Sequence, residues 1–282
     1  MTDTVPAWGG ELDPPERLLR LDVNALNYCA YDMALRDADE LSGWLAVPNT
    51  LESAWIDVYA LPERKRVAEA VGRQGVLGRG LERPPIVMGL RLAFEDGVLR
   101  LVAGYEDGSV QAWVLSETST GLHAELSWSH RPHTESVMAL TLTPAHDRVM
   151  SVGADARLAQ CVLAESTQPE VWTLPRPGNA SVAMRDDARV LAVGGWDGAV
   201  RVFSRDAQLL ATLVYHKEGV SAVAYIRQGR VHMLAVPEAD SDEELAHPVP
   251  RHLLVAGAKD GRVSLWDVPF TRDDVMPRLR AP

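Results

Sequence analysis

The stretch Leu253–Val268 reads Leu-Leu-Val-Ala-Gly-Ala-Lys-Asp-Gly-Arg-Val-Ser-Leu-Trp-Asp-Val. Its short apolar run leads into Lys259-Asp260-Gly261, which is turn chemistry because Asp bonds its own backbone and Gly takes positive φ freely. From Arg262 onward apolar and polar residues alternate, as they do in a half-buried strand. The stretch therefore predicts a β-hairpin with Asp260 in its turn.

The same hairpin recurs along the chain. Its turn aspartates are Asp107, Asp155, Asp197 and Asp260, separated by 48, 42 and 63 residues, and a diverged copy with a longer turn spans Trp44–Leu61. An aromatic position follows the turn in most copies, six residues past the aspartate where there is one, and holds Tyr59, Trp113, Phe203 and Trp266; Cys161 takes it in the weak third copy. A strand–Asp–strand unit with a period of about 40–45 residues is typical of a WD-type β-propeller.

We therefore predict an all-β chain with five visible blades, since stacking around an axis buries the sheet faces. The first blade is expected to begin with a strand at Val23–Tyr31, followed by an acidic loop at Arg36–Gly43. Four more blades are expected at residues 86–130, 136–174, 180–215 and 219–268. We expect residues 1–16 to form a disordered segment, 17–268 the propeller and 269–282 a polar tail, with the acidic insertion 227–251 interrupting the fifth blade.

Two histidines precede first strands of blades in the pattern His-x-x-x-Val. We predict that His133 pairs with Asp155 and His216 with Asp260, so that each imidazole bridges a loop to a turn carboxylate. A structural role of this kind is favoured over catalysis. The stripe Trp113, Phe203 and Trp266 recurs at repeat spacing and is interpreted as core, not as a platform for stacking nucleic acid bases.

Composition excludes several function classes. The chain has 282 residues, a formal net charge of −11 and two cysteines, Cys29 and Cys161. This balance argues against direct nucleic acid binding, which needs clustered Lys and Arg, and the distant cysteines indicate buried thiols. No apolar run is long enough for a membrane span, and no signal peptide, phosphate-binding loop or nucleophile elbow is present. His130-Arg-Pro-His133 lacks the further ligands of a metal site, so no metal or cofactor is expected.

The acidic insertion contains Asp240-Ser241-Asp242-Glu243-Glu244. A hydroxyl directly ahead of carboxylates suits an acidophilic kinase, and a phosphate there could be held by basic residues of a partner. Ser241 is therefore a candidate phosphorylation site, with a merely solubilising loop as the alternative.

Six segments carry a resemblance to a known family: Leu21–Ala30, Ala46–Ser53, Leu101–Gly108, Gly194–Phe203, His216–Val220 and Gly257–Asp267. Together they resemble the ASTRA-associated protein 1 family of WD-repeat proteins, whose animal relatives are called G-protein β-subunit-like protein 1. The pieces Val-Pro-Asn-Thr-Leu and Trp-Asp-Gly-x-Val-Arg-Val are more specific than a generic WD repeat. The resemblance implies a nuclear, or also cytoplasmic, adaptor in the ASTRA assembly, which is linked to chromatin remodelling.

The resemblance also implies work with the TTT co-chaperone that matures phosphatidylinositol-3-kinase-like kinases, with protein subunits as partners. Family members carry two further WD repeats ahead of the segment matching Leu21, whereas nothing before Arg17 is typical of a blade. We therefore expect an incomplete seven-bladed propeller.

The ring ends leave two geometries open. In the favoured open arc, apolar faces of the first and fifth blades are exposed. In the alternative, Arg17–Leu21 pairs with Arg262–Asp267 and closes a five-bladed ring.

The sequence supports a non-catalytic scaffold over a propeller enzyme or small-ligand binder that uses the central channel. A channel site would need His, Asp or Glu where the innermost strands begin. Those positions hold apolar residues, namely Val87, Met88, Val137, Val182 and Val220.

Overall fold

The computed structural model describes residues 20–24, 29–37, 42–73, 84–226 and 252–270, and within these ranges it contains strands and turns but no helix. The first sheet comprises β1 (Asp32–Asp37), β2 (Ser42–Pro48), β3 (Ile56–Leu61) and β4 (Lys65–Val71). The second comprises β5 (Val87–Glu95), β6 (Val98–Tyr105), β7 (Val110–Glu117) and β8 (Leu122–His130). The third comprises β9 (Val137–Leu142), β10 (Arg148–Gly153), β11 (Arg157–Val162) and β12 (Glu170–Thr173).

The fourth sheet comprises β13 (Asn179–Met184), β14 (Val190–Gly195), β15 (Ala199–Ser204) and β16 (Leu209–Val214). The fifth comprises β17 (Val220–Tyr225), β18 (Leu253–Ala258) and β19 (Val263–Asp267). In every sheet neighbouring strands are antiparallel and adjacent in sequence. This is the five-bladed, all-β WD-type architecture that the sequence predicts.

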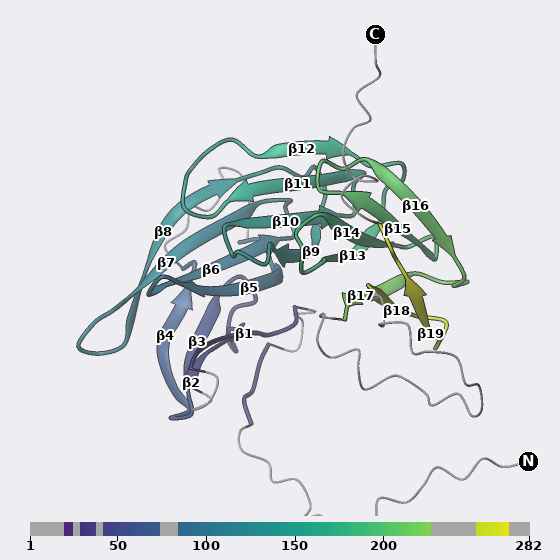
Figure 1. Cartoon of the computed structure of the whole chain (residues 1–282). Helices are drawn as coiled ribbons and strands as arrows, with labels where there is room; N and C mark the ends of the chain where they lie inside the picture. The colour runs from purple at the N-terminus through teal and green to yellow at the C-terminus, as the bar shows by residue number, and fades with distance from the viewer. Residues whose placement is uncertain (1–19, 25–28, 38–41, 74–83, 227–251, 271–282) are drawn as a thin grey trace, which may run out of the picture.

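The blades follow one another round an arc, with the first and fifth sheets at its two ends (Figure 1). Innermost strands contact each other in chain order: β5 packs against β1 and β9, and β13 against β9 and β17. Within the described residues β19 pairs only with β18, so the fifth sheet has three strands, and neither Arg20 nor Leu21 lies in a strand. Arg17–Leu19 lie outside the described residues.

The predicted beginning of the first blade is wrong. The described parts of Val23–Tyr31 carry no strand, and β1 instead occupies Asp32–Asp37, overlapping the expected loop. The carboxylate of Asp32 helps to hold this mostly exposed strand, since its Oδ2 accepts a hydrogen bond from the Leu92 N–H of β5 at 2.7 Å. Burial raises the pKa of Asp32, and this inter-blade contact offsets part of that cost.

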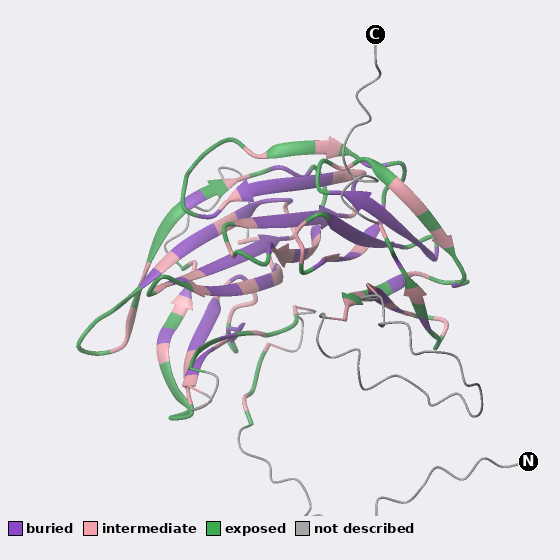
Figure 2. Cartoon of the chain, viewed as in Figure 1, coloured by how far each residue is buried: buried purple, intermediate pink, exposed green. Residues whose placement is uncertain are grey.

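Hydrophobic clusters fill the space between successive sheets. Central strands such as β10 and β15 are accordingly buried almost throughout and are purple in Figure 2. The central hairpins share one register: the aromatic position faces the residue six places before the turn aspartate. The pairs are Trp113 with Leu101, Cys161 with Val149, Phe203 with Leu191 and Trp266 with Leu254. At the aromatic position, Trp113, Cys161 and Phe203 each belong to the hydrophobic cluster between their own blade and the preceding blade. Trp266 packs against the corresponding cluster between the fourth and fifth blades.

Tyr59 stands in the equivalent slot of the first blade, opposite Leu45, and is only half-buried. Its neighbours Ile56 and Val58 belong to the cluster shared with the second blade, so the alternating strand turns Tyr59 to the other side. No described blade lies on that side, which accounts for its exposure.

Candidate functional site

The four turn aspartates make the same local contact. In each, Oδ1 accepts a hydrogen bond from the backbone N–H two residues further on, at 3.0 Å for Asp107, 3.1 Å for Asp155, 3.2 Å for Asp197 and 3.1 Å for Asp260. This contact closes the hairpin turn in the way expected of an Asx turn. The end of the blades that carries these turns is called the turn face below.

His133 and Asp155 are brought together at this face. The Nδ1 of His133 lies 3.0 Å from Asp155 Oδ1, its Nε2 lies 2.9 Å from Ser151 Oγ, and Asp155 Oδ2 accepts from the Thr134 N–H at 2.8 Å. His133 is 1% exposed. Burial lowers its pKa; the hydrogen bond and charge of Asp155 oppose that shift, and the charge of Arg157 adds to it. The imidazole therefore ties the link between two blades to a turn.

His216 and Asp260 form the corresponding pair in the fifth blade. His216 Nδ1 lies 3.3 Å from both carboxylate oxygens, and its Nε2 lies 2.8 Å from Ser264 Oγ. The indole N–H of Trp266 donates to the same hydroxyl at 2.8 Å, which connects the aromatic position to the pair. Both rings are thus engaged in holding the blade.

Asp197 has no histidine partner, and Arg201 takes that place. The guanidinium donates from Nη1 to Asp197 Oδ1 at 3.1 Å and bridges to Oδ2, while Arg201 is 8% exposed. Hydrogen bonds from Arg201 are the main reason that the pKa of Asp197 is held below its usual range. The sequence did not predict this pair, because an arginine four residues after a turn aspartate carries no distinctive pattern and the contact depends on the register of the hairpin.

The first blade closes its longer turn with an amide in place of the turn aspartate. Asn49 Oδ1 accepts the backbone N–H groups of Leu51 and Glu52, and its Nδ2 donates to Asp57 Oδ1 at 2.9 Å. Asp57 is 1% exposed and also receives a hydrogen bond from Arg66 at 3.3 Å. This network was not predicted, although Asn in a long turn is a known signal.

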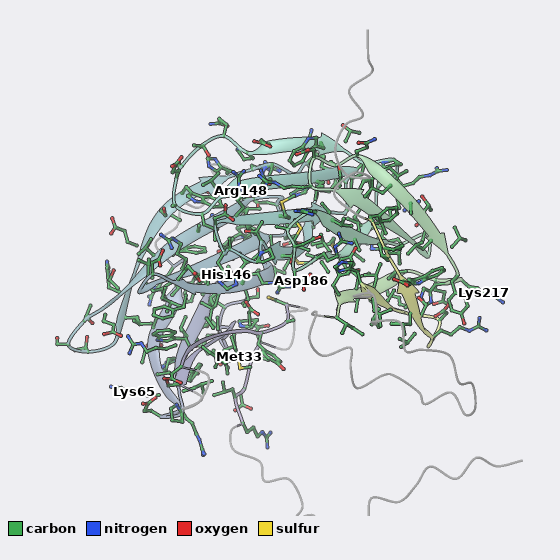
Figure 3. All side chains as sticks on the ribbon, viewed as in Figure 1. Met33, Lys65, His146, Arg148, Asp186 and Lys217 are labelled. Atoms are coloured by element: carbon green, nitrogen blue, oxygen red, sulfur yellow. The ribbon has the colours of Figure 1, made fainter. Side chains whose placement is uncertain are left out.

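Arg185 fastens the last hairpin to the fourth blade. Its guanidinium donates to the carbonyl oxygens of Val268 at 3.0 Å and Phe270 at 2.8 Å, and it is paired with Asp187 at 2.7 Å. Arg185 is 1% exposed, so a buried charge here is compensated on every side. Figure 3 labels Asp186, which lies between Arg185 and Asp187 in the chain, and Lys217, which lies near the end of the arc.

Glycine at one strand position, three residues before the turn aspartate, allows close packing at two junctions between blades. A Cβ placed on Gly104 would lie 2.5 Å from Val137 of the next blade, and one on Gly194 would lie 2.8 Å from Val220. A Cβ on Gly257, at the same position of the fifth blade, would meet nothing within 4 Å. The fifth blade therefore has the glycine that other blades use at a junction, but no described blade packs against it on that side.

Side chains around Gly257 are exposed accordingly. Val263 and Leu265 of β19 are 71% and 56% exposed, whereas Val110 and Ala112 at the same repeat positions of the second blade are 0% and 1% exposed. Met33 and Leu35 of β1 are also exposed, at 51% and 46%. An exposed apolar face at each end is the arrangement expected of the open arc.

Other groups offer no evident chemistry within the described residues. They contain no group of three or more His, Cys, Asp or Glu that could hold a metal ion, and no helix long and apolar enough to cross a membrane. Cys161 is buried, and burial raises the pKa of both Cys161 and the half-buried Cys29 to about 12. Ser241 lies outside the described residues.

Comparison with known proteins gives the family. Residues 207–267 match the description "WD domain, G-beta repeat". ASTRA-associated protein 1 of Verticillium alfalfae is 32% identical over 90% of this chain and 67% of its own length, and that of Penicillium rubens is 26% identical over 94% and 74%.

A mouse relative, guanine nucleotide-binding protein subunit beta-like protein 1, is 33% identical over 66% of this chain and 50% of its own length. Among solved structures, Chaetomium thermophilum Sqt1, bound to the N-terminus of ribosomal protein L10, shares the fold with a TM-score of 0.56 and 17% identity. That match covers 84% of this chain and 58% of Sqt1. The chain belongs to the ASTRA-associated protein 1 family of WD-repeat proteins.

Proposed function

We propose that the protein is a non-catalytic WD-repeat scaffold subunit of an ASTRA-type assembly. The observation that carries the non-catalytic part is the use of the polar side chains on the turn face. His133, His216 and Arg201 are each more than nine-tenths buried, and each hydrogen-bonds a turn carboxylate. A catalytic group needs access to a reacting atom, and these side chains are enclosed in structural contacts. The names of the relatives support the assembly.

The alternative, an enzyme or small-ligand binder using the central channel, has weaker support. Val87, Val137, Val182 and Val220 lie at or near the starts of innermost strands and are at most 6% exposed. Apolar, packed side chains at these positions supply neither an acid–base group nor a polar ligand contact. The nucleus, with the cytoplasm as a second compartment, is the proposed location, and chromatin remodelling and maturation of phosphatidylinositol-3-kinase-like kinases are the proposed processes.

Affinity purification at native expression, followed by mass spectrometry, tests the proposal. Subunits of an ASTRA-type assembly should be recovered in reproducible ratio with the tagged chain. An unrelated WD-repeat protein of similar abundance, tagged in the same way, is the control for generic propeller contacts. Recovery of the chain by itself, or of the same proteins with both baits, would contradict the proposal.

A further inference from the structure

A basic hollow lies where the second and third blades meet at the turn face. It measures about 370 Å³ and is lined by His130, Arg131, Pro132, Arg157, Gln168, Pro169, Val171 and Thr173. Among the described residues no Asp or Glu lines it. In a chain of net charge −11, a cavity with two guanidinium groups and no carboxylate is a local inversion of charge.

The two arginines differ in how they are held. Arg157 opens β11, and its Nη1 donates to the Pro132 carbonyl at 2.8 Å, which fixes the guanidinium across the blade junction. Arg131 is exposed and makes no hydrogen bond or ion pair to any residue that the structure describes. One cation is therefore preorganised and the other is left to meet a ligand, and a guanidinium pairs best with planar or tetrahedral oxyanions.

The walls add an apolar component. Val171 is 44% exposed on β12, and in the hollow it lies with Pro132 and Pro169 near the arginines. Such walls fit the methylene stem of a side chain whose head is anionic. A free inorganic anion would leave them uncovered, whereas a glutamate or a phosphoserine would use both parts.

A second hollow, of about 320 Å³, shares His130 and Arg131 with the first. This second hollow reaches Ala54 and Gly72 of the first blade, and its lining mixes apolar residues with the neutral polar side chains of Ser109, Gln111 and Ser129. Its carboxylate, Asp107, already accepts the N–H and hydroxyl of Ser109. The two hollows together offer anion contacts at one end and amide and hydroxyl partners at the other, as an extended peptide requires.

We propose that this surface binds an acidic segment of a partner protein, with an anionic side chain seated between Arg131 and Arg157. The inference deepens the proposed scaffold function by naming the chemistry of a partner, and it rests on that function. The carboxylate of Glu and the phosphate of phosphoserine share the chemistry that the hollow recognises.

Fluorescence anisotropy with purified full-length chain tests the proposal. The probes are short fluorescein-labelled peptides of one length that carry glutamates, phosphoserines or, as the neutral control, glutamines. We expect the glutamate or the phosphoserine peptide, or both, to bind in a salt-sensitive way, and the tighter one identifies the source of the anion. Arg131→Gln should weaken binding about tenfold or more, because a charged hydrogen-bond donor is lost.

Arg205→Gln is the matched control, because this substitution removes the same charge from an exposed arginine that lies outside both hollows. Equal weakening by the two substitutions, equal binding of the neutral peptide, or no binding of either acidic peptide would overturn the proposal. Because subunit recovery from cells is measured separately, loss of peptide binding with intact recovery would overturn the acidic-segment site and leave the scaffold function standing.

Discussion

At the residue scale, the turn face is a set of buried polar bonds that fix loops between blades. The turn aspartates and their histidine partners follow from sequence because the strand–Asp–strand hairpin and the His-x-x-x-Val link both recur; three of the turns are Asp-Gly, and the turn at Asp155 is Asp-Ala. Ser151, Ser264 and Arg201 complete these bonds from strand positions that carry no such signature. They could be found only once the register of the hairpins was known.

The buried imidazole of His133 should make stability depend on pH. Its pKa is lowered in the folded chain, so as the pH falls below about 6.5 the unfolded state takes up the proton first and folding is disfavoured. The contribution of His133 to the free energy of unfolding is thus fully present above about pH 6.5. Between that pH and the lowered pKa of the folded chain, it falls by up to about 1.4 kcal/mol for each pH unit. Urea unfolding at pH 7.5 and 5.5 should show the loss.

His133→Gln removes the titrating group, so its stability gap to the wild type should narrow at pH 5.5. His123→Gln, at an exposed position of β8, is the control and should leave the pH dependence unchanged. A gap of the same size at both pH values would mean that His133 does not titrate in this window.

At the element scale, the repeat hairpin determines which face of each blade meets its neighbour. The ranges expected for the second to fifth blades, 86–130, 136–174, 180–215 and 219–268, agree with the ends of the observed sheets to within one residue. The start of the first blade was mispredicted because β1 is mostly exposed and is held by a hydrogen bond between Asp32 and Leu92, which are 60 residues apart in sequence. Alternation of apolar and polar residues indicates a strand with one buried face, so it does not detect a strand that is held by a carboxylate hydrogen bond.

Glycines at the junction position give a matched pair of substitutions. Gly104→Ala places a Cβ 2.5 Å from Val137, so overpacking should lower the free energy of unfolding by about 1–3 kcal/mol. Gly257→Ala meets no atom within 4 Å, and the stiffer unfolded chain should raise stability by about 0.4–1 kcal/mol. Chemical denaturation of both variants measures the difference, and a shift of the same sign in both would contradict this account of the junctions.

At the scale of the whole molecule, the arc presents apolar surface where a junction has no described partner. Leu265→Glu should reduce self-association and dye binding at exposed apolar surface while changing stability by no more than about 0.5 kcal/mol. Ala112→Glu, at the same repeat position of a filled junction, should unfold the chain or lower its melting temperature sharply because it buries a charge. Light scattering and thermal melts on both variants check this, and an equal loss of stability would show that the face around Leu265 is covered.

The central claim, that the chain works as a subunit of a larger assembly, is tested most directly by its native size. Size-exclusion chromatography of a gentle lysate, with detection of the chain at native expression, gives the fraction of molecules held in complexes. We predict that most of the chain elutes far above its own 30.8 kDa, in fractions that keep their size after nuclease treatment. Elution of most of the chain at the size of a single molecule would contradict the claim.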